Sequence, residues 1–168
     1  DVNFRASHEH EKIKLMSNIM ENMEYADIVR GSSEDFAILY NKTDAEAIYK
    51  SQISFYTKKF IYTSGSAPVI LKADGGFSKQ YAVESASTVS TIGAGDNFNA
   101  GVIFGLLKHG ITREHIDNGL TEEQWDGIIG CAMRFSANVC KSINNYVDNE
   151  FATAMKREMS DFIEENNK

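Results

Sequence analysis

The chain has 168 residues and is acidic, with 17 Lys and Arg against 24 Asp and Glu and a formal charge of −7 at pH 7. A chain of this length buries enough surface to fold without disulfides or metal ions, so we expect a single domain over residues 1–168. The acidic balance argues against a nucleic-acid partner, because phosphate contacts need clustered Lys and Arg. No apolar run reaches the roughly 18 residues of a membrane span, and the polar start is unlike a signal peptide. We therefore expect a cytoplasmic protein without a membrane partner.

The first part of the chain predicts three helices and one strand. Residues 7–25 predict an amphipathic helix, because apolar side chains recur three and four positions apart: Ile13, Met16, Ile19, Met20 and Met23. Residues 26–30 form a short apolar run that is typical of a buried strand. Either serine at positions 32–33 can cap the next helix. Residues 43–44 open another, with an inner side formed by Ala47, Ile48, Ile53 and Phe55.

The middle of the chain predicts a small β-meander. Residues 60–63 and 69–72 have the apolar and β-branched composition of strands. Between them and the next strand, residues 73–76 read Ala-Asp-Gly-Gly, and Asp-Gly supplies the positive φ angles of a tight hairpin. Residues 77–83 should therefore return antiparallel.

The last part of the chain predicts three helices. The first follows Gly93 and ends at Gly110 in the C′ position. The second begins at Thr121 and is apolar around much of its circumference, so it should be buried, and its thiols Cys131 and Cys140 are expected to be reduced. The third covers residues 148–165. Helices that alternate with strands indicate an α/β fold.

One segment, residues 90–101, combines small residues with a carboxylate at the start of a helix. Gly93, Ala94 and Gly95 leave the backbone N–H groups accessible to a large anion. The helix N-terminus carries about half a positive charge, so phosphate is the expected ligand. Asp96 lies beside this position and could accept the proton of an attacking hydroxyl, or it could simply cap the helix. The segment matches neither a Walker A loop nor the dinucleotide fingerprint.

Residues 90–103 resemble the second signature of the ribokinase-like (PfkB) carbohydrate kinases at all fourteen positions. Residues 1–5 are similar to the family's Asp-x-Asn-x-Arg segment, and residues 26–30 to the strand before its Asn-x-x-Glu motif. Residues 60–65 are similar to the strand and Thr-x-Gly turn that border the nucleotide. The resemblance implies a three-layer α/β/α fold with a partly parallel sheet. This chain would be its C-terminal, nucleotide-binding half, without the N-terminal sugar-binding and lid portion.

The resemblance also implies an activity: fructokinase-like transfer of a phosphoryl group from ATP to a sugar hydroxyl, with Mg²⁺ and with a homodimer in the full-length protein. It implies that Asp96 is the catalytic base and that the anion hole is formed by Gly93, Ala94 and Gly95. Nucleotide contacts are implied for Asn3, Thr63 and Gly65. Asn138 either contacts the base or packs in the core.

Two departures from the family pattern bear on this interpretation. Residues 32–35 read Ser-Ser-Glu-Asp where the family has Asn-x-x-Glu. Asp35 keeps the acid at one methylene less and is the candidate magnesium residue. Ser90 stands where aspartate is commonest in the family. The alternative function is therefore a non-catalytic nucleotide-binding or assembly module.

Overall fold

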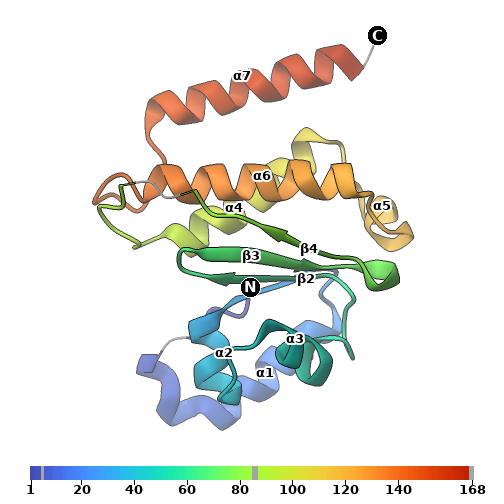
Figure 1. Cartoon of the computed structure of the whole chain (residues 1–168), viewed down its shortest axis with the longest axis vertical. Coiled ribbons are helices and arrows are strands. Elements are labelled where there is room, and N and C mark those ends of the chain that lie inside the picture. The colour runs from blue at the N-terminus through green and yellow to red at the C-terminus, as the bar shows by residue number, and fades with distance from the viewer. Residues whose placement is uncertain (5, 85–86, 167–168) are drawn as a thin grey trace. The chain divides into compact units, whose positions relative to one another are not determined.

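A computed structural model describes residues 1–4, 6–84 and 87–166. The chain divides into two compact units, Asp1–Glu84 and Ser85–Lys168 (Figure 1). The expected single domain over residues 1–168 stays a prediction.

The first unit is built on a four-stranded sheet with the order β1-β2-β3-β4. The strands are β1 Val29–Ser32, β2 Phe60–Ser64, β3 Ala67–Lys72 and β4 Ser78–Tyr81. β1 and β2 are parallel, and the other two pairs are antiparallel. The sheet is therefore partly parallel, as expected. The positive φ angles of the β3–β4 hairpin lie at Gly75 (67°) and Gly76 (80°), one residue later than the predicted Asp-Gly.

The helices of the first unit lie on one face of this sheet (Figure 1). They are a 3₁₀ turn Ala6–Glu11, α1 Lys12–Glu24, α2 Ser33–Tyr40, α3 Ala45–Ile48 and a π-helical turn Tyr49–Ile53. The predicted caps are confirmed, because the side chains of Ser32 and Asp44 accept hydrogen bonds from the first turns of α2 and α3. The core beneath them contains Phe36, Ile48, Ile53, Phe60 and Tyr62.

Two predicted apolar faces are wrong in part. On α1, Met23 is buried and Ile19 packs against the core, whereas Ile13 is 86% exposed and Met20 is 43% exposed. Only the C-terminal turns of α1 therefore reach the core. Phe55, expected on the inner side of its helix, is 79% exposed. The N–H of Ser54 bonds to the carbonyl of Tyr49, five residues back, and this wider turn ends the helix before Phe55.

The second unit is a set of helices: α4 Ala94–Lys108, α5 Arg113–Asn118, α6 Glu122–Val139 and α7 Asn149–Asn166. α4 and α6 pack closely, because Gly101 and Gly105 on α4 face the backbone of α6. A Cβ at Gly101 would lie 2.5 Å from the Cα of Ala132, and one at Gly105 would lie 2.7 Å from the Cα of Ile128. Cys131 and Cys140 are free thiols, as predicted.

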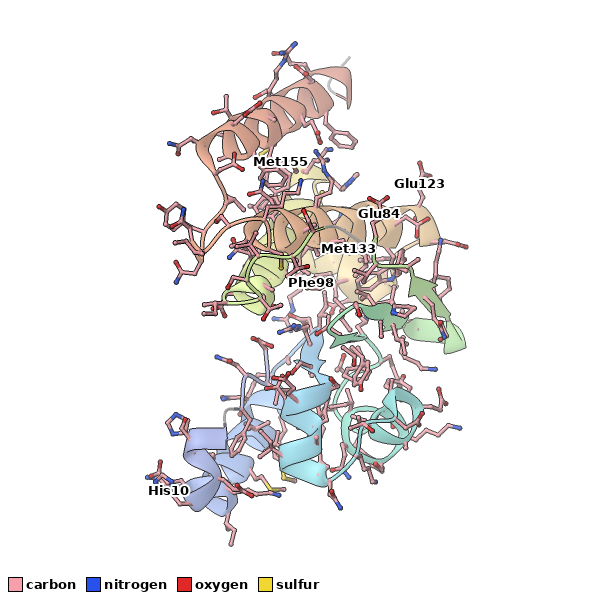
Figure 2. The ribbon with its side chains drawn as sticks, turned by 60° about the vertical axis from the view of Figure 1, so that its left-hand side comes forward. His10, Glu84, Phe98, Glu123, Met133 and Met155 are labelled. Atoms are coloured by element: carbon pink, nitrogen blue, oxygen red, sulfur yellow. The ribbon has the colours of Figure 1, made fainter. Side chains whose placement is uncertain are left out.

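Both apolar and charged contacts connect α7 to the other helices of the second unit. Met155 is 1% exposed, and its side chain points from α7 towards α6 (Figure 2). Glu158 accepts two hydrogen bonds from Arg134, at 2.6 and 2.9 Å, and one from Lys108 at 3.1 Å. These cations lower the pKa of Glu158 to about 2, with the Arg134 hydrogen bond as the largest cause. The last helix and the buried α6 were both predicted, whereas the six-residue α5 was not.

Candidate functional site

Gly93 is the residue immediately before α4, and its backbone conformation disfavours any residue with a side chain. Its φ angle is 79°, in the left-handed region that side chains disfavour. A Cβ there would also lie 2.9 Å from the backbone oxygen and the Cβ of Asn145. The glycine therefore suits both the turn into the helix and the close approach of the loop 140–148 between α6 and α7.

The first turn of α4 presents backbone donors. The N–H of Ala94 bonds to the carbonyl of Thr91 at 3.1 Å, and the N–H of Asn97 bonds to the carbonyl of Gly93 at 2.9 Å. The N–H groups of Gly95 and Asp96, between them, have no acceptor within the described ranges. With the positive end of the helix dipole, these two amides form an arrangement that can bind an anion.

Asp96 is the third residue of α4, and its side chain is exposed. Its carboxylate forms no hydrogen bond or ion pair with the part of the chain that the structure describes. The capping alternative is therefore not what the structure shows. A carboxylate that no protein donor occupies is available to accept a proton from a hydroxyl.

Asn97 was missed by sequence reasoning and holds the loop against this turn. Its Nδ2 donates to the carbonyl of Gly93 at 2.9 Å and to the carbonyl of Asn145 at 3.0 Å. One amide thus joins the start of α4 to a loop 48 residues later. The sequence signal was weak, because the partner of Asn97 lies 48 residues later in the chain.

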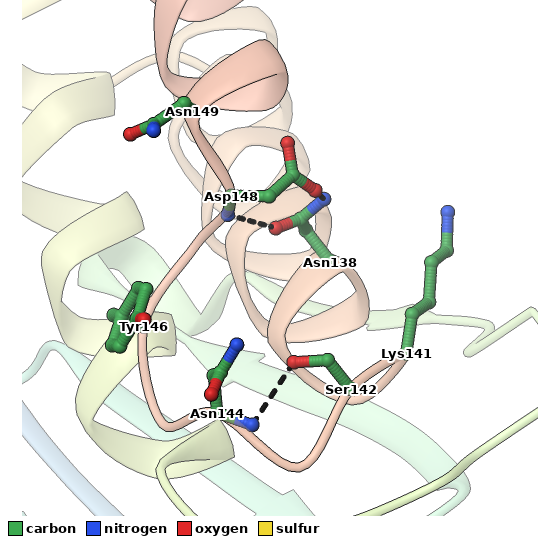
Figure 3. Close-up of a pocket in the computed structure, with 7 residues that line it drawn as sticks. All are labelled: Asn138, Lys141, Ser142, Asn144, Tyr146, Asp148 and Asn149. Atoms are coloured by element: carbon green, nitrogen blue, oxygen red, sulfur yellow. Dashed lines mark hydrogen bonds between the residues drawn. The ribbon is translucent and has the colours of Figure 1, made fainter.

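A polar cavity of about 300 Å³ lies between the end of α6 and the start of α7 (Figure 3). Its lining residues are Asn138, Lys141, Ser142, Asn144, Tyr146, Asp148 and Asn149. Both amide atoms of Asn138 are occupied, since Nδ2 donates to the carboxylate of Asp148 at 2.8 Å and Oδ1 accepts from the N–H of Asp148 at 3.1 Å. The N–H of Phe151 and this Nδ2 together lower the pKa of Asp148. Asn138 therefore lines a cavity while fixing the start of α7.

In the first unit, Thr63 and Gly65 lie at the end of β2 and in the turn to β3. The hydroxyl oxygen of Thr63 accepts a hydrogen bond from Nη2 of Arg30 at 2.7 Å, so its own proton remains available for another acceptor. Gly65 has a φ angle of 51°, and apart from its two chain neighbours nothing described lies within 4 Å of the position that a Cβ would take. The turn is therefore open on this side.

Asn3 lies in the segment that precedes the first turn of the chain. Its side chain is exposed, and its φ angle of 41° is positive, which is uncommon for a residue other than glycine. The neighbouring residues are bonded on both sides: the N–H of Val2 donates to the carbonyl of Arg30 at 2.9 Å, and the N–H of Phe4 donates to the carboxylate of Asp35 at 2.7 Å. Arg5, the last residue of the predicted motif, lies outside the described residues.

Asp35 is 6% exposed, and protein donors occupy both of its oxygens. Oδ1 accepts from the N–H of Phe4, and Oδ2 accepts from the N–H and the hydroxyl of Ser32, all at 2.7 Å. Mg²⁺ demands octahedral geometry and usually keeps several waters. Across the described residues, no group of three or more His, Cys, Asp or Glu side chains could hold a metal ion. The surroundings of Asp35 do not fit a magnesium ion.

No helix within residues 1–4, 6–84 and 87–166 is both long and apolar enough to cross a bilayer.

Known structures show what the fold resembles. Aminoimidazole riboside kinase from Salmonella enterica, in complex with aminoimidazole riboside and an ATP analogue, matches with 17% identity and a TM-score of 0.68, over 94% of this chain and 50% of that one. Fructokinase from Vibrio cholerae O395, with fructose, ADP and calcium ion bound, matches with 17% identity and a TM-score of 0.66, over 79% and 40%. Adenosine kinase from Anopheles gambiae, with a di(adenosine) tetraphosphate, matches with 23% identity and a TM-score of 0.55, over 76% and 38%.

The chain thus spans half or less of the length of these solved structures. At such identities the likeness shows the fold, and it confirms the ribokinase-like α/β class. No curated protein sequence matches the chain. The model of the pfkB family of carbohydrate kinases matches residues 1–121, which is more than two thirds of the sequence. The chain therefore belongs to the pfkB carbohydrate kinase family.

Proposed function

We propose that the protein transfers a phosphoryl group from ATP to a hydroxyl of a sugar, as the catalytic, nucleotide-binding half of a kinase. The observation that carries the proposal is the first turn of α4, where the carboxylate of Asp96 lies next to the amides of Gly95 and Asp96 and none of these groups bonds to a described residue. A general base and an anion-binding turn are two of the groups that proteins use in phosphoryl transfer. A cytoplasmic location and a homodimer stay predictions.

The reaction follows from these groups. Asp96 accepts the proton of the acceptor hydroxyl while the hydroxyl oxygen forms a bond to the γ-phosphorus of ATP. The bond from that phosphorus to the β,γ-bridging oxygen breaks, and ADP leaves with the electron pair. The amides of Gly95 and Asp96 stabilise the negative charge on the transferring group. Gly93 and Ala94 leave room for this group, because they have little or no side chain. Catalysis by such positioning and charge stabilisation is typical of phosphoryl transfer.

Nucleotide contacts are proposed for four further residues: Asn3, Thr63, Gly65 and Asn138. Thr63 can donate its hydroxyl proton, Gly65 leaves an open turn, and Asn138 lines the polar cavity. The bound ADP and calcium ion of the fructokinase support a nucleotide accompanied by a divalent cation, which we expect to be Mg²⁺. Because Asp35 does not fit such an ion, no step of the transfer is assigned to it.

Replacement of the base tests the proposal. Asp96→Asn keeps the shape of the side chain and removes its proton affinity, so turnover should fall by about 10²–10⁴-fold while ATP affinity stays within about twofold. The assay measures sugar-dependent ADP release, on the 168-residue chain and on the complete gene product in parallel, with a panel of sugars. Glu123→Gln, an exposed acid in the first turn of α6, is the matched control and should change neither quantity. Normal turnover of Asp96→Asn would contradict the proposal.

A non-catalytic nucleotide-binding module is the second candidate. The observation that favours it is Asp35, whose oxygens are occupied where the family pattern places an acid associated with the metal. Calorimetric titration of ATP with Mg²⁺ separates the two. Binding without phosphorylation of any sugar by the complete gene product would favour the module, and sugar-dependent ADP release would rule it out.

A further inference from the structure

We propose that Asp35 is a positioning residue that fixes Asn3 for contact with the nucleotide, and that it is not a magnesium ligand. The inference rests on the proposed function, because Asn3 has a task only if a nucleotide binds. It departs from the sequence expectation, which placed the metal at Asp35.

The carboxylate of Asp35 bonds to two separate segments of the chain. Asp35 is the third residue of α2, and its Oδ2 bonds back to the N–H and the hydroxyl of Ser32, which forms a capping box. Oδ1 points the other way and accepts the N–H of Phe4, 31 residues earlier, at 2.7 Å in a buried position. One carboxylate therefore ties the start of α2 to the N-terminal segment.

The hydrogen bond from Phe4 to Asp35 fixes the backbone on one side of Asn3. The N–H of Val2 bonds to the carbonyl of Arg30 in β1, and Phe4 is 5% exposed. Asn3 lies between these two anchored residues with a φ angle of 41°. Asparagine tolerates this left-handed conformation better than most residues with a side chain, and the hydrogen bonds of Val2 and Phe4 on either side of it fix the backbone there. The exposed Asn3 side chain is thus presented from a fixed backbone.

The carboxylate of Asp35 has few acceptor sites left for a metal ion. Two backbone N–H groups and one hydroxyl already occupy most of its acceptor capacity, which is about four lone pairs. The residue is 6% exposed, so a hydrated ion has little access to the remaining one. The hydrogen bonds that make Asp35 an anchor for the N-terminal segment therefore argue against its role as a metal ligand.

Amide hydrogen exchange tests the anchor without any nucleotide. Asp35→Asn offers a single carbonyl acceptor, which cannot serve both Phe4 and Ser32. We expect the exchange of the Phe4 amide to accelerate at least about tenfold, which corresponds to a loss of about 1.4 kcal/mol. Glu34→Gln, the exposed neighbour in the same helical turn, removes the same charge and should leave the Phe4 amide unchanged. Unchanged exchange in Asp35→Asn would overturn the anchor.

A double-mutant cycle tests the link to Asn3. In the wild-type background Asp35→Asn should weaken ATP binding about three- to tenfold, and in an Asn3→Ala background it should weaken binding no further. The Mg²⁺ concentration at half-maximal ATP binding should stay within about twofold. A full additional loss in the Asn3→Ala background, or a tenfold shift in the Mg²⁺ midpoint, would overturn the proposal.

The experiments distinguish a failure of the proposed function from a failure of the anchoring role of Asp35. If the wild-type chain binds no ATP, the proposed function fails for this chain, and the Phe4 exchange still decides whether Asp35 is the anchor. If Asp35→Asn does not fold, Ser32→Ala replaces it in both experiments. This variant removes one donor from Oδ2 and keeps the acid, so we expect the same pattern with smaller effects.

Discussion

Asp35 and Asp96 occupy the same position in two helices and have opposite environments. Each is the third residue of its helix, Asp35 in α2 and Asp96 in α4. Asp35 is buried, and its two oxygens accept three hydrogen bonds. Asp96 is exposed and bonds to none of the described residues. A carboxylate in a given helical position can therefore be a structural anchor or a reactive group.

The residue at the N-cap accounts for much of the difference. Ser32 offers Asp35 a hydroxyl and an N–H, which complete the capping box. Gly93 has no side chain and enters α4 with a φ angle of 79°, so Asp96 has no such partner. A glycine before the helix leaves both the acid and the neighbouring amides available for a ligand.

The largest effect is expected where the glycine is replaced. Gly93→Ala places a Cβ at positive φ and 2.9 Å from Asn145, so the free energy of unfolding should fall by about 2–3 kcal/mol. Urea denaturation measures it. Gly130→Ala is the matched control, because its Cβ would meet nothing within 4 Å apart from its chain neighbours and the nearby backbone of its own helix. Alanine is also the better helix former, so stability should rise by up to about 1 kcal/mol. Equal stability of the two variants would remove the steric argument.

A smaller loss of stability is expected when Ser32, the N-cap residue of α2, is replaced. Ser32→Ala removes the hydroxyl that accepts the Asp35 N–H and donates to Oδ2. Loss of such a cap costs about 1 kcal/mol. Chemical denaturation at neutral pH measures it, with Ser66→Ala, an exposed serine in the turn between β2 and β3, as control. A loss in Ser66→Ala as large as that in Ser32→Ala would show that the capping box is not what stabilises α2.

The smallest effect concerns a third carboxylate, Glu158, and it depends on pH. Its pKa is about 2 in the folded chain, below the ordinary 4.5, because Arg134 and Lys108 favour the charged form. Its contribution to stability is therefore present above pH 4.5 and is lost as the pH falls towards 2. Glu158 is 38% exposed, so solvent screening keeps this below about 1 kcal/mol.

Denaturation of the wild type and Glu158→Gln between pH 7 and pH 2.5 measures this contribution. The gap between the two should narrow with acid and shrink in high salt. A gap that does not change with pH would show that the ion pairs do not hold α7.

Local signals in the sequence predicted the helix starts well. Ser32, Asp44 and Thr121 all cap the helices that follow them, because capping depends on side chains two or three residues away. The glycine turn before α4 and the end of that helix at Gly110 were also predicted, since both depend on local backbone conformation.

Features that depend on distant parts of the chain escaped prediction. The bond from Asn97 to Asn145 spans 48 residues, and that from Phe4 to Asp35 spans 31. The apolar spacing of α1 could not show that Ile13 would be left exposed, because exposure is decided by which turns reach the core. The sequence therefore predicted the reactive turn, whereas the surroundings of Asp35 required the structure.

A paired denaturation experiment distinguishes the opposite roles of the two aspartates. The free energies of unfolding of Asp35→Asn and Asp96→Asn are measured side by side with the wild type in urea at neutral pH. We expect a loss of about 2–3 kcal/mol for Asp35→Asn and a change within about 0.5 kcal/mol for Asp96→Asn. Equal losses, or a larger loss for Asp96→Asn, would contradict the assignment of Asp35 as the anchor and Asp96 as the reactive group.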